Sequence, residues 1–365
     1  MPEGSGDVGN LPSLRLEEDL ADDLFRRLNA GNGPAGKGRT TKRHRDHSQV
    51  KRSQCSYLAW SFILVLLKIR DAVLIDQVPL SYAQQIVVLE AFHGSPFGAS
   101  LTRDVVFLSH QPTGQVFLLH RPSVRRRAQR SLTPSTPISS PAFVSVDARL
   151  PVGSRVDRND TFTNAALQQL SELPEAGGIF QLRTPTHAAV AFAGWLLDYA
   201  VIYRFEHPGP GLTAASPDAS VSLCLVESQD EVSLNEDAFW EAARPNNLAS
   251  QPLRLFRVAL ETRSNSTPSR IDLYSFTCPV AAFDVSSQDT RPDLLSSAET
   301  LREAIQTDVA QRLRSALDIL KTCRSNSQKG HTKSADHALD ELPDFLSDAR
   351  VLVTHSEVSL PQVAL

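Results

Sequence analysis

The sequence has little cysteine and no cysteine motif. It holds four cysteines in 365 residues, at positions 55, 224, 278 and 323, and no two of them form a C-x-x-C pair. Structural zinc and iron–sulfur sites need closely spaced thiol pairs, and disulfide scaffolds are far richer in cysteine. The spacing therefore predicts four reduced, mostly packed cysteines and no metal site.

A long apolar run is also missing. The strongest run covers residues 57–67, whereas a helix that spans a membrane needs about 20 apolar residues. The first ten residues are polar and lack the apolar segment of a secretory signal. We therefore expect a cytoplasmic or nuclear protein that is neither secreted nor membrane-bound, and we expect residues 57–67 to form a buried helix.

Charge is unevenly distributed along the chain. Residues 37–52 hold seven basic residues and one acidic residue, and residues 121–130 hold five arginines and no acidic residue. The rest of the chain holds 25 basic and 40 acidic residues. An acidic body is a poor surface for nucleic acid, because neutralised phosphates supply most of that affinity. The charge pattern favours a protein partner, which it does not identify.

Composition divides the chain into one domain with interruptions. Glycine, proline and serine surround both basic segments, a composition typical of solvated linkers. We predict an N-terminal helix within residues 1–30, a disordered basic linker over 31–52, and a single domain over 53–365. A disordered insert at 121–142 and a flexible segment at 324–343 are predicted to interrupt that domain.

The two basic segments carry candidate regulatory motifs. Residues 42–45 (Lys-Arg-His-Arg) resemble a nuclear-import signal, and Thr133, Thr136 and Ser140 each precede a proline downstream of the arginines. Phosphates there would cancel the basic charge. The alternatives, a charged linker without a receptor and inert Ser/Thr-Pro sites, stay open.

Hydrophobic periodicity predicts alternating strands and helices in the first half, then a run of strands and one long helix. This order is typical of an α/β (or α+β) fold: a single mixed β-sheet covered by helices, with an antiparallel meander in the C-terminal half. The expected helices cover 14–28, 54–69, 80–92, 161–170, 185–197 and 294–320, and the expected strands cover 72–76, 105–109, 115–120, 143–147, 178–182, 201–205, 221–226, 253–262, 271–276 and 351–353.

Three stretches of sequence resemble one known family. They are Asp-Leu-Tyr-Ser-Phe-Thr-Cys-Pro at 272–279, the C-terminal Ser-Leu-Pro-Gln-Val-Ala-Leu at 359–365, and Leu-Ile-Asp at 74–76 followed by a helix. These segments are similar to the family represented by the human chromosome-one open-reading-frame seventy-four protein. The resemblance covers residues 53–120 and 142–365. It implies one shared domain, and it implies no activity or catalytic residue, because the family has no assigned activity.

Two glycine-containing segments superficially match catalytic motifs. Residues 31–36 match G-x-G-x-x-G, but a phosphate loop needs a strand before it and a helix after it. Residues 93–98 (His-Gly-Ser-Pro-Phe-Gly) lack the G-x-S-x-G spacing of a nucleophile elbow. We interpret the first segment as linker and the second as a turn that ends a helix.

Asp76 and Asp147 are the strongest candidate site residues. Each follows an apolar run at the end of a predicted strand, and ligands of open α/β sheets bind at the carboxyl ends of strands. Two carboxylates there would bind a metal or act as acid and base. The alternative is that each carboxylate caps a helix or ends a strand in a turn.

Thr184 and His187 form a weaker candidate. Thr184 precedes a predicted helix that begins at Pro185, and His187 lies in its first turn. Free amides at a helix start bind anions, so these residues are a weak candidate for binding an anionic cofactor, and simple capping by Thr184 is the favoured alternative. The sequence identifies no cofactor.

These observations lead to two hypotheses. The first is an interaction or regulatory module, because no complete catalytic set of residues survives inspection of its surroundings. The second is a small-molecule or metal-dependent enzyme with a strand-edge site around Asp76 and Asp147. The second requires the two carboxylates to face one pocket, about 6–8 Å apart, as paired catalytic carboxylates do.

Overall fold

The computed structural model describes the chain over residues 14–30, 50–111, 113–133, 141–147, 150–156, 161–184, 188–205, 222–225, 247–262, 269–283, 295–327 and 333–359. Within these residues it is an α/β fold, as predicted, and the C-terminal half holds the predicted antiparallel strands. The strands form three sheets and not the single sheet expected from the sequence.

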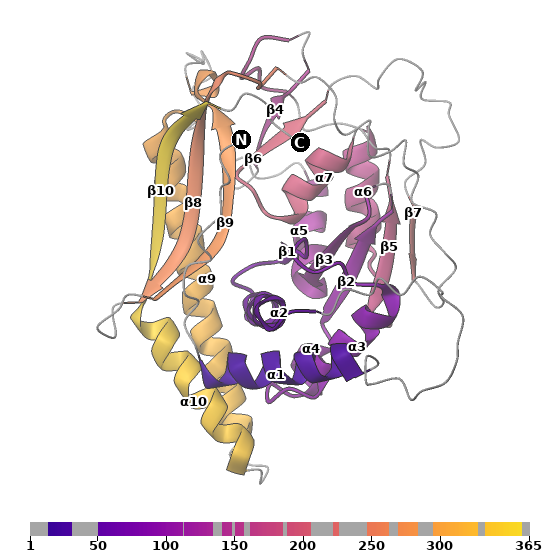
Figure 1. Ribbon diagram of the computed structural model, residues 1–365. Helices are drawn as coiled ribbons and strands as arrows, with labels where there is room; N and C mark the ends of the chain where they lie inside the picture. The colour runs from indigo at the N-terminus through magenta and orange to yellow at the C-terminus, as the bar shows by residue number, and fades with distance from the viewer. Residues whose placement is uncertain are drawn as a thin grey trace, which may run out of the picture.

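The largest sheet has five strands in the order β1-β3-β2-β5-β7 (Figure 1). β2 and β3 form a hairpin, β2 and β5 run parallel, and the other neighbouring pairs are antiparallel. The strands are β1 (Ala72–Leu74), β2 (Val105–His110), β3 (Gln115–His120), β5 (Ile179–Arg183) and β7 (Ser222–Leu225).

Helices cover both faces of this sheet. One face packs against α2 (Arg52–Leu66) and α3 (Tyr82–His93). The other face buries Val106, Leu108 and Phe180 against helices α5, α6 and α7. These helices are α5 (Arg121–Leu132), α6 (Thr161–Ser171) and α7 (Ala189–Leu196), and α4 (Ala99–Thr102) is a short helix after α3.

The C-terminal layer is an antiparallel sheet in the order β10-β8-β9, which α9 backs on one face, while α10 lies at the lower end of the sheet beside α9 (Figure 1). β8 (Pro252–Thr262), β9 (Ser269–Pro279) and β10 (Ala349–Ser359) have eleven residues each. The long helix α9 (Ala298–Ser327) buries one stripe of apolar side chains, Leu301, Ile305, Val309, Leu313 and Leu320. α10 (Lys333–Asp348) leads directly into β10.

Two further elements join the layers. β4 (Ala142–Ser145) and β6 (Val201–Arg204) form a separate parallel pair, and β6 lies near β9. A short 3-10 helix, η5 (Val280–Ala282), follows β9.

The apolar part of α2, residues 57–66, needs more cover than one sheet can supply. Ten of its residues are buried, so it has no face that tolerates water, and a helix that is apolar all round must be covered on every side. Phe62 stacks on Phe92 of α3 at 3.9 Å between ring centroids, while Trp60 packs against Phe345 of α10 at 5.8 Å. The five-stranded sheet covers one side of α2, and α1 (Arg15–Asn29) and the C-terminal layer cover the others.

The prediction of a disordered insert at 121–142 is wrong for its first half. Residues 121–132 form α5, which begins with Pro122 in its first turn and with the His120 side chain as its cap. Arg121 is buried, and its guanidinium donates to the carbonyl oxygens of Pro174 and Arg103. This arginine is therefore packed and hydrogen-bonded, whereas the composition around it had indicated a solvated linker. Residues 134–140 lie outside the described residues.

The predicted flexible segment at 324–343 is also largely helical. α9 continues to Ser327, and α10 begins at Lys333 and buries Leu342 and Leu346 in the core. Residues 328–332 lie outside the described part of the chain, as do residues 31–49 with the predicted import signal, and residues 360–365. The described helices include none that is long and apolar enough to cross a membrane.

Candidate functional site

The two candidate carboxylates do not share a sheet. Asp76 is exposed after β1, in the five-stranded sheet, whereas Asp147 is buried after β4, in the two-stranded sheet. The backbone N–H of Asp147 donates to Ser145 Oγ at 3.2 Å, and Asn247 Nδ2 donates to its carbonyl oxygen at 3.1 Å. The premise of one common strand edge is therefore wrong, and these bonds fit a residue that ends a strand in a turn.

Thr184 points into the core and not toward an anion site. It follows β5, it is 2 % exposed, and its Oγ1 lies 2.7 Å from Nε2 of His110 on β2. Residues 185–187, which include His187, lie outside the described residues, and α7 begins at Ala189. The proposed anion site thus keeps only Thr184, whose hydroxyl already bonds a histidine.

His110 and Thr184 mark the carboxyl ends of the parallel pair β2 and β5. His110 Nδ1 lies 2.8 Å from Thr113 Oγ1, so both ring nitrogens have hydroxyl partners. Burial lowers the pKa of His110 to about 4, which leaves the ring neutral at pH 7. The adjoining cavity has a volume of about 10 Å³, room for about one water molecule, and it is lined by Thr163, Ala166, Leu167, Thr184, Ala188, Phe192 and Trp195. The arrangement holds a histidine in the core and leaves no space for a substrate.

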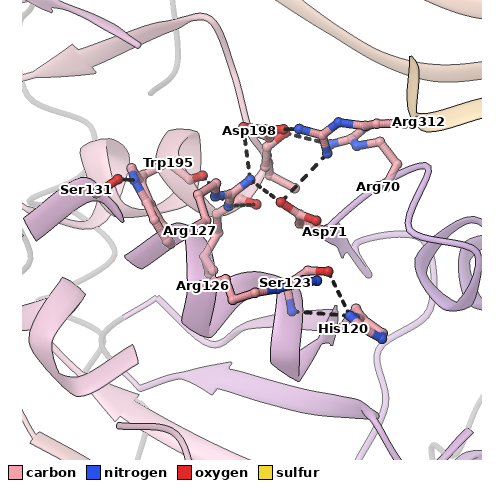
Figure 2. A network of polar contacts seen from close by, with 12 residues as sticks. Arg70, Asp71, His120, Ser123, Arg126, Arg127, Ser131, Trp195, Asp198 and Arg312 are labelled. Atoms are coloured by element: carbon pink, nitrogen blue, oxygen red, sulfur yellow. Dashed lines mark hydrogen bonds and ion pairs between the residues drawn. The ribbon is translucent and has the colours of Figure 1, made fainter. Parts of the chain in front are cut away.

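His120 and Ser123 make a second buried histidine–hydroxyl pair. Their Nδ1 and Oγ atoms are 2.8 Å apart, and the Ser123 backbone N–H also donates to Nδ1 (Figure 2). Burial, with the nearby Lys68, lowers the pKa of His120 to about 3. Because both residues are at most 5 % exposed, this pair serves as the N-terminal cap of α5.

The largest polar cluster is an ionic junction that comprises Arg70, Asp71, Arg127, Asp198 and Arg312 (Figure 2). Arg127 Nη1 lies 3.0 Å from Asp71 Oδ2 and 2.9 Å from Asp198 Oδ1. Arg312 contacts the same two carboxylates. These residues come from the α2–β1 connection, α5, the α7–β6 connection and α9, so the ionic junction ties the two layers of the fold together.

Two arginines of the ionic junction also cap α7. Arg127 Nη2 donates to the carbonyl oxygens of Trp195 and Leu196 at 2.8 and 2.9 Å, and Arg70 Nη2 donates to that of Leu197 at 2.8 Å. The last carbonyls of a helix have no partners within it and carry partial negative charge. The arginines satisfy them and hold the end of α7 in place.

Arg70 covers the outer edge of β9. The side chain is buried, its Nη1 donates to Leu273 O at 2.5 Å, and its guanidinium lies 4.2 Å from the ring centroid of Tyr274. Burial lowers the pKa of Arg70. Further along β9, Tyr203 of β6 bonds Thr277 Oγ1 at 2.9 Å. We call this covered side of β9 the closed edge.

Asp198 is the central anion of the ionic junction. Its φ of 58° places it in the left-handed region that non-glycine residues rarely adopt, and that strain is typical of functionally or structurally constrained positions. Burial opposes its ionisation, but Arg127, Arg312 and Arg70 outweigh burial and lower the pKa of Asp198 to about 2. The carboxylate therefore stays charged at any physiological pH.

The ionic junction was not predicted from the sequence. One signal was present: the pair Arg70-Asp71 comes directly after a strongly apolar helix, and Asp198 directly follows the apolar α7. Charged residues that follow a buried apolar helix in this way must be paired or hydrogen-bonded in the core. The identity of those partners depends on the arrangement of four segments that are distant in the sequence, which no local pattern contains.

The other side of the C-terminal sheet differs from the closed edge. β10 pairs with β8 on one side only, and no described strand lies on its other side. We call this side of β10 the open edge. It extends over eleven residues and contains neither proline nor lysine, the residues with which proteins commonly protect such edges.

Two observations show which backbone groups face outward at the open edge. Gln306 Nε2 of α9 donates to Val351 O at 3.5 Å, so this carbonyl points away from β8. Pro279 of β9 lies opposite Leu253 of β8 and has no N–H to donate, so the polar groups of Leu253 face Val358 of β10. Because backbone polar groups alternate along an antiparallel strand, those of residues 351, 353, 355 and 357 face outward.

No family model matches the chain, and no curated protein or solved structure matches it. The resemblance seen in the sequence therefore stays a prediction. Among the described residues, no group of three or more His, Cys, Asp and Glu side chains is placed to hold a metal ion.

Proposed function

We propose that the protein is an interaction module that binds an extended segment of a protein partner along the open edge of β10. The observation that carries this proposal is the outward row of backbone N–H and C=O groups on an eleven-residue strand, beside which no described strand lies. An added strand satisfies such groups by main-chain hydrogen bonds, and its alternate side chains supply specificity.

The surroundings of the open edge support a strand as the ligand. α9 backs β10 without covering its outer side: Gln306 reaches Val351 O, and Glu299 Oε2 lies 3.2 Å from His355 Nε2. Glu357 is 58 % exposed and has one cation, Arg254, at 3.7 Å. The edge thus mixes both signs of charge, which suits a polypeptide better than a phosphate backbone.

The polar side chains in the interior support the hypothesis of an interaction module over that of an enzyme. His110 and His120 are buried, neutral and bonded to hydroxyls, and the ionic junction pairs its arginines with carboxylates and carbonyls. The enzyme hypothesis built on Asp76 and Asp147 has lost its common strand edge. Side chains that carry chemistry in other proteins therefore hold the layers together here.

Peptide binding tests the proposal. The probe is a fluorescein-labelled ten-residue peptide that alternates threonine and valine, with a lysine at each end, and its anisotropy is measured against nanomolar full-length protein. We expect saturable binding to the wild type and at least tenfold weaker binding to Glu357→Pro, because proline removes an outward N–H while β8 pairing remains.

The controls separate edge binding from adhesion. Arg257→Lys on the exposed face of β8 keeps every edge group and should bind the peptide like the wild type. A peptide with proline at alternate positions should not bind. Equal binding to Glu357→Pro and the wild type, or no binding to either, would overturn the proposed function.

A further inference from the structure

We infer that the segment bound at the open edge is β10 of a second copy of this chain, in an antiparallel pair related by a two-fold axis. This inference rests on the proposed function and names its partner. Joining the two edges would make one continuous six-stranded sheet from two three-stranded sheets. Such an interface is isologous, because the same strand contributes to both sides of it.

The sequence of β10 is complementary to itself in one register. When His355 lies on the two-fold axis, Leu352 faces Val358 of the second copy, and Thr354 faces Ser356 of the second copy. Each pair occurs twice, so on the exposed face of β10 apolar side chains meet apolar ones and hydroxyls meet hydroxyls, while on the face toward α9 Val353 lies opposite Glu357. Directly opposed pairs of these kinds stabilise antiparallel strands.

Charge agrees with this register. Glu357 points to the same face of the strand as His355 and lies diagonally across from His355 of the second copy, on both sides of the axis. Diagonal neighbours are within reach of long side chains. Glu357 is more than half exposed in the single chain, where its partner is Arg254 at 3.7 Å, so its carboxylate is accessible to the second copy.

Other registers fit less well. A two-fold axis at Thr354 places Leu352 opposite Ser356 and Arg350 opposite Val358, which joins apolar to polar side chains. An axis at Leu352 brings residue 356 opposite Asp348 of the second copy, where α10 ends and the strand has not begun. The register centred on His355 uses residues 351–359 and stays clear of α10.

The open edge also has little built-in protection against a second copy. Regular edge strands avoid pairing through proline, lysine, bulges or a covering loop. The register irregularity of this sheet lies between Val258 and Ala259, where β8 pairs with β9. Among the described residues, the partner found for the outward backbone groups of β10 is the Gln306 amide, which bonds Val351 O. An intact eleven-residue ladder edge is the geometry that self-pairing requires.

Sedimentation velocity of the full-length chain tests the inference. We expect a dimer of about 80 kDa that dissociates on dilution, and at least a tenfold rise in the dimer dissociation constant for Glu357→Pro and for Leu352→Lys. Arg257→Lys, on the same face but one strand inward, should dimerise like the wild type. Circular dichroism of each variant confirms that it is folded before it is scored.

Disulfide trapping fixes the register. The double variant T354C/S356C places cysteines opposite each other in the register centred on His355, so oxidation should give a covalent dimer. The matched control L352C/T354C places no cysteine opposite another, and it should stay largely monomeric. Cross-linking of the control but not of T354C/S356C would overturn the proposed pairing.

The outcomes distinguish this inference from the proposed function. A chain that stays monomeric at all concentrations but binds the threonine–valine peptide at β10 would refute the second copy and keep the interaction module. A dimer that Glu357→Pro leaves unchanged would place the contact elsewhere and refute the inference. A monomer that also ignores the peptide would refute both.

Discussion

The two edges of the C-terminal sheet are treated in opposite ways. On the β9 side, buried Arg70 bonds Leu273 O and stacks on Tyr274, and Tyr203 bonds Thr277. On the β10 side, the contact found among the described residues is the Gln306 amide at the carbonyl oxygen of Val351. The fold covers the first edge with a buried arginine, anchored beside the ionic junction, and leaves the second in reach of another strand.

The closed edge at β9 is held by side-chain contacts, whereas the open edge at β10 is accessible to another strand. Burial of a cation is costly unless it is paired and hydrogen-bonded, so covering β9 with Arg70 relies on the carbonyl oxygens of Leu273 and Leu197 and on the nearby carboxylate of Asp198. β10 needs no such support, because α9 packs on its inner face. The following predictions test the two edges separately.

The largest expected effect comes from removing the central anion. Asp198→Ala should lower the free energy of unfolding by about 3–5 kcal/mol, because it removes the carboxylate that lies closest to both Arg127 and Arg312, two largely buried cations. Chemical denaturation measures it. The control is Asp308→Ala: Asp308 also contacts Arg312, at 2.8 Å, but it is 58 % exposed, and its loss should cost at most about 1 kcal/mol. Equal costs for the two variants would contradict a central role for Asp198.

A second prediction concerns the core that supports the closed edge. Leu66 lies near the end of α2, four residues before Arg70, and is 1 % exposed. Leu66→Ala should destabilise the protein by about 2–5 kcal/mol through the lost contacts and the cavity. Ile86→Ala, at a position that is 37 % exposed, should cost far less. If Leu66→Ala lowered the free energy of unfolding by less than about 1 kcal/mol, half of the lower expected value, α2 would lie outside the core.

A third prediction compares neighbouring proline substitutions on the open edge. Ser356 directs its N–H toward β8, so Ser356→Pro should break the ladder and cost about 1–3 kcal/mol, the loss expected for an unsatisfied buried group. Glu357→Pro keeps the ladder and should cost clearly less. Thermal unfolding of both variants at low protein concentration checks the order, and the reverse order would show that the assignment of outward groups is wrong.

A fourth prediction uses pH. The pKa values of His110 and His120 are lowered to about 4 and about 3 in the folded state. The unfolded chain therefore binds more protons below about pH 6.5, and stability present above that pH is lost as the pH falls toward 4. The slope should reach about 1.4 kcal/mol per pH unit for each histidine. His110→Gln should reduce the slope, and an unchanged slope would contradict a neutral buried His110.

Much of the fold was predictable because it is coded locally. The apolar run around Trp60 required burial on all sides, and the stripe from Leu301 to Leu320 required a long helix with one covered face. Both were found where periodicity placed them. Periodicity does not state which strands share a sheet, and for that reason Asp76 and Asp147 were assigned to one edge that does not exist.

The charged elements were harder to predict for a physical reason. The arginines of α5 suggested a solvated insert, but distant groups neutralise Arg121 and Arg127: carbonyl oxygens for the first, Asp71 and Asp198 for the second. β10 was expected only over residues 351–353. Its polar residues, among them Thr354 and Ser356, belong to its exposed face, and they weaken the apolar signal that marks a strand.

Amide hydrogen exchange along β10 tests the contrast between the edges most directly. It is measured residue by residue by NMR on the full chain, at concentrations below and above dimer formation. In the dilute protein, the amides of Val353, His355 and Glu357 should exchange at least a hundredfold faster than those of Leu352, Thr354 and Ser356, and that alternation should vanish in the concentrated protein. Uniform protection along β10 in the dilute protein would show that its outer edge is already covered, and would contradict the account.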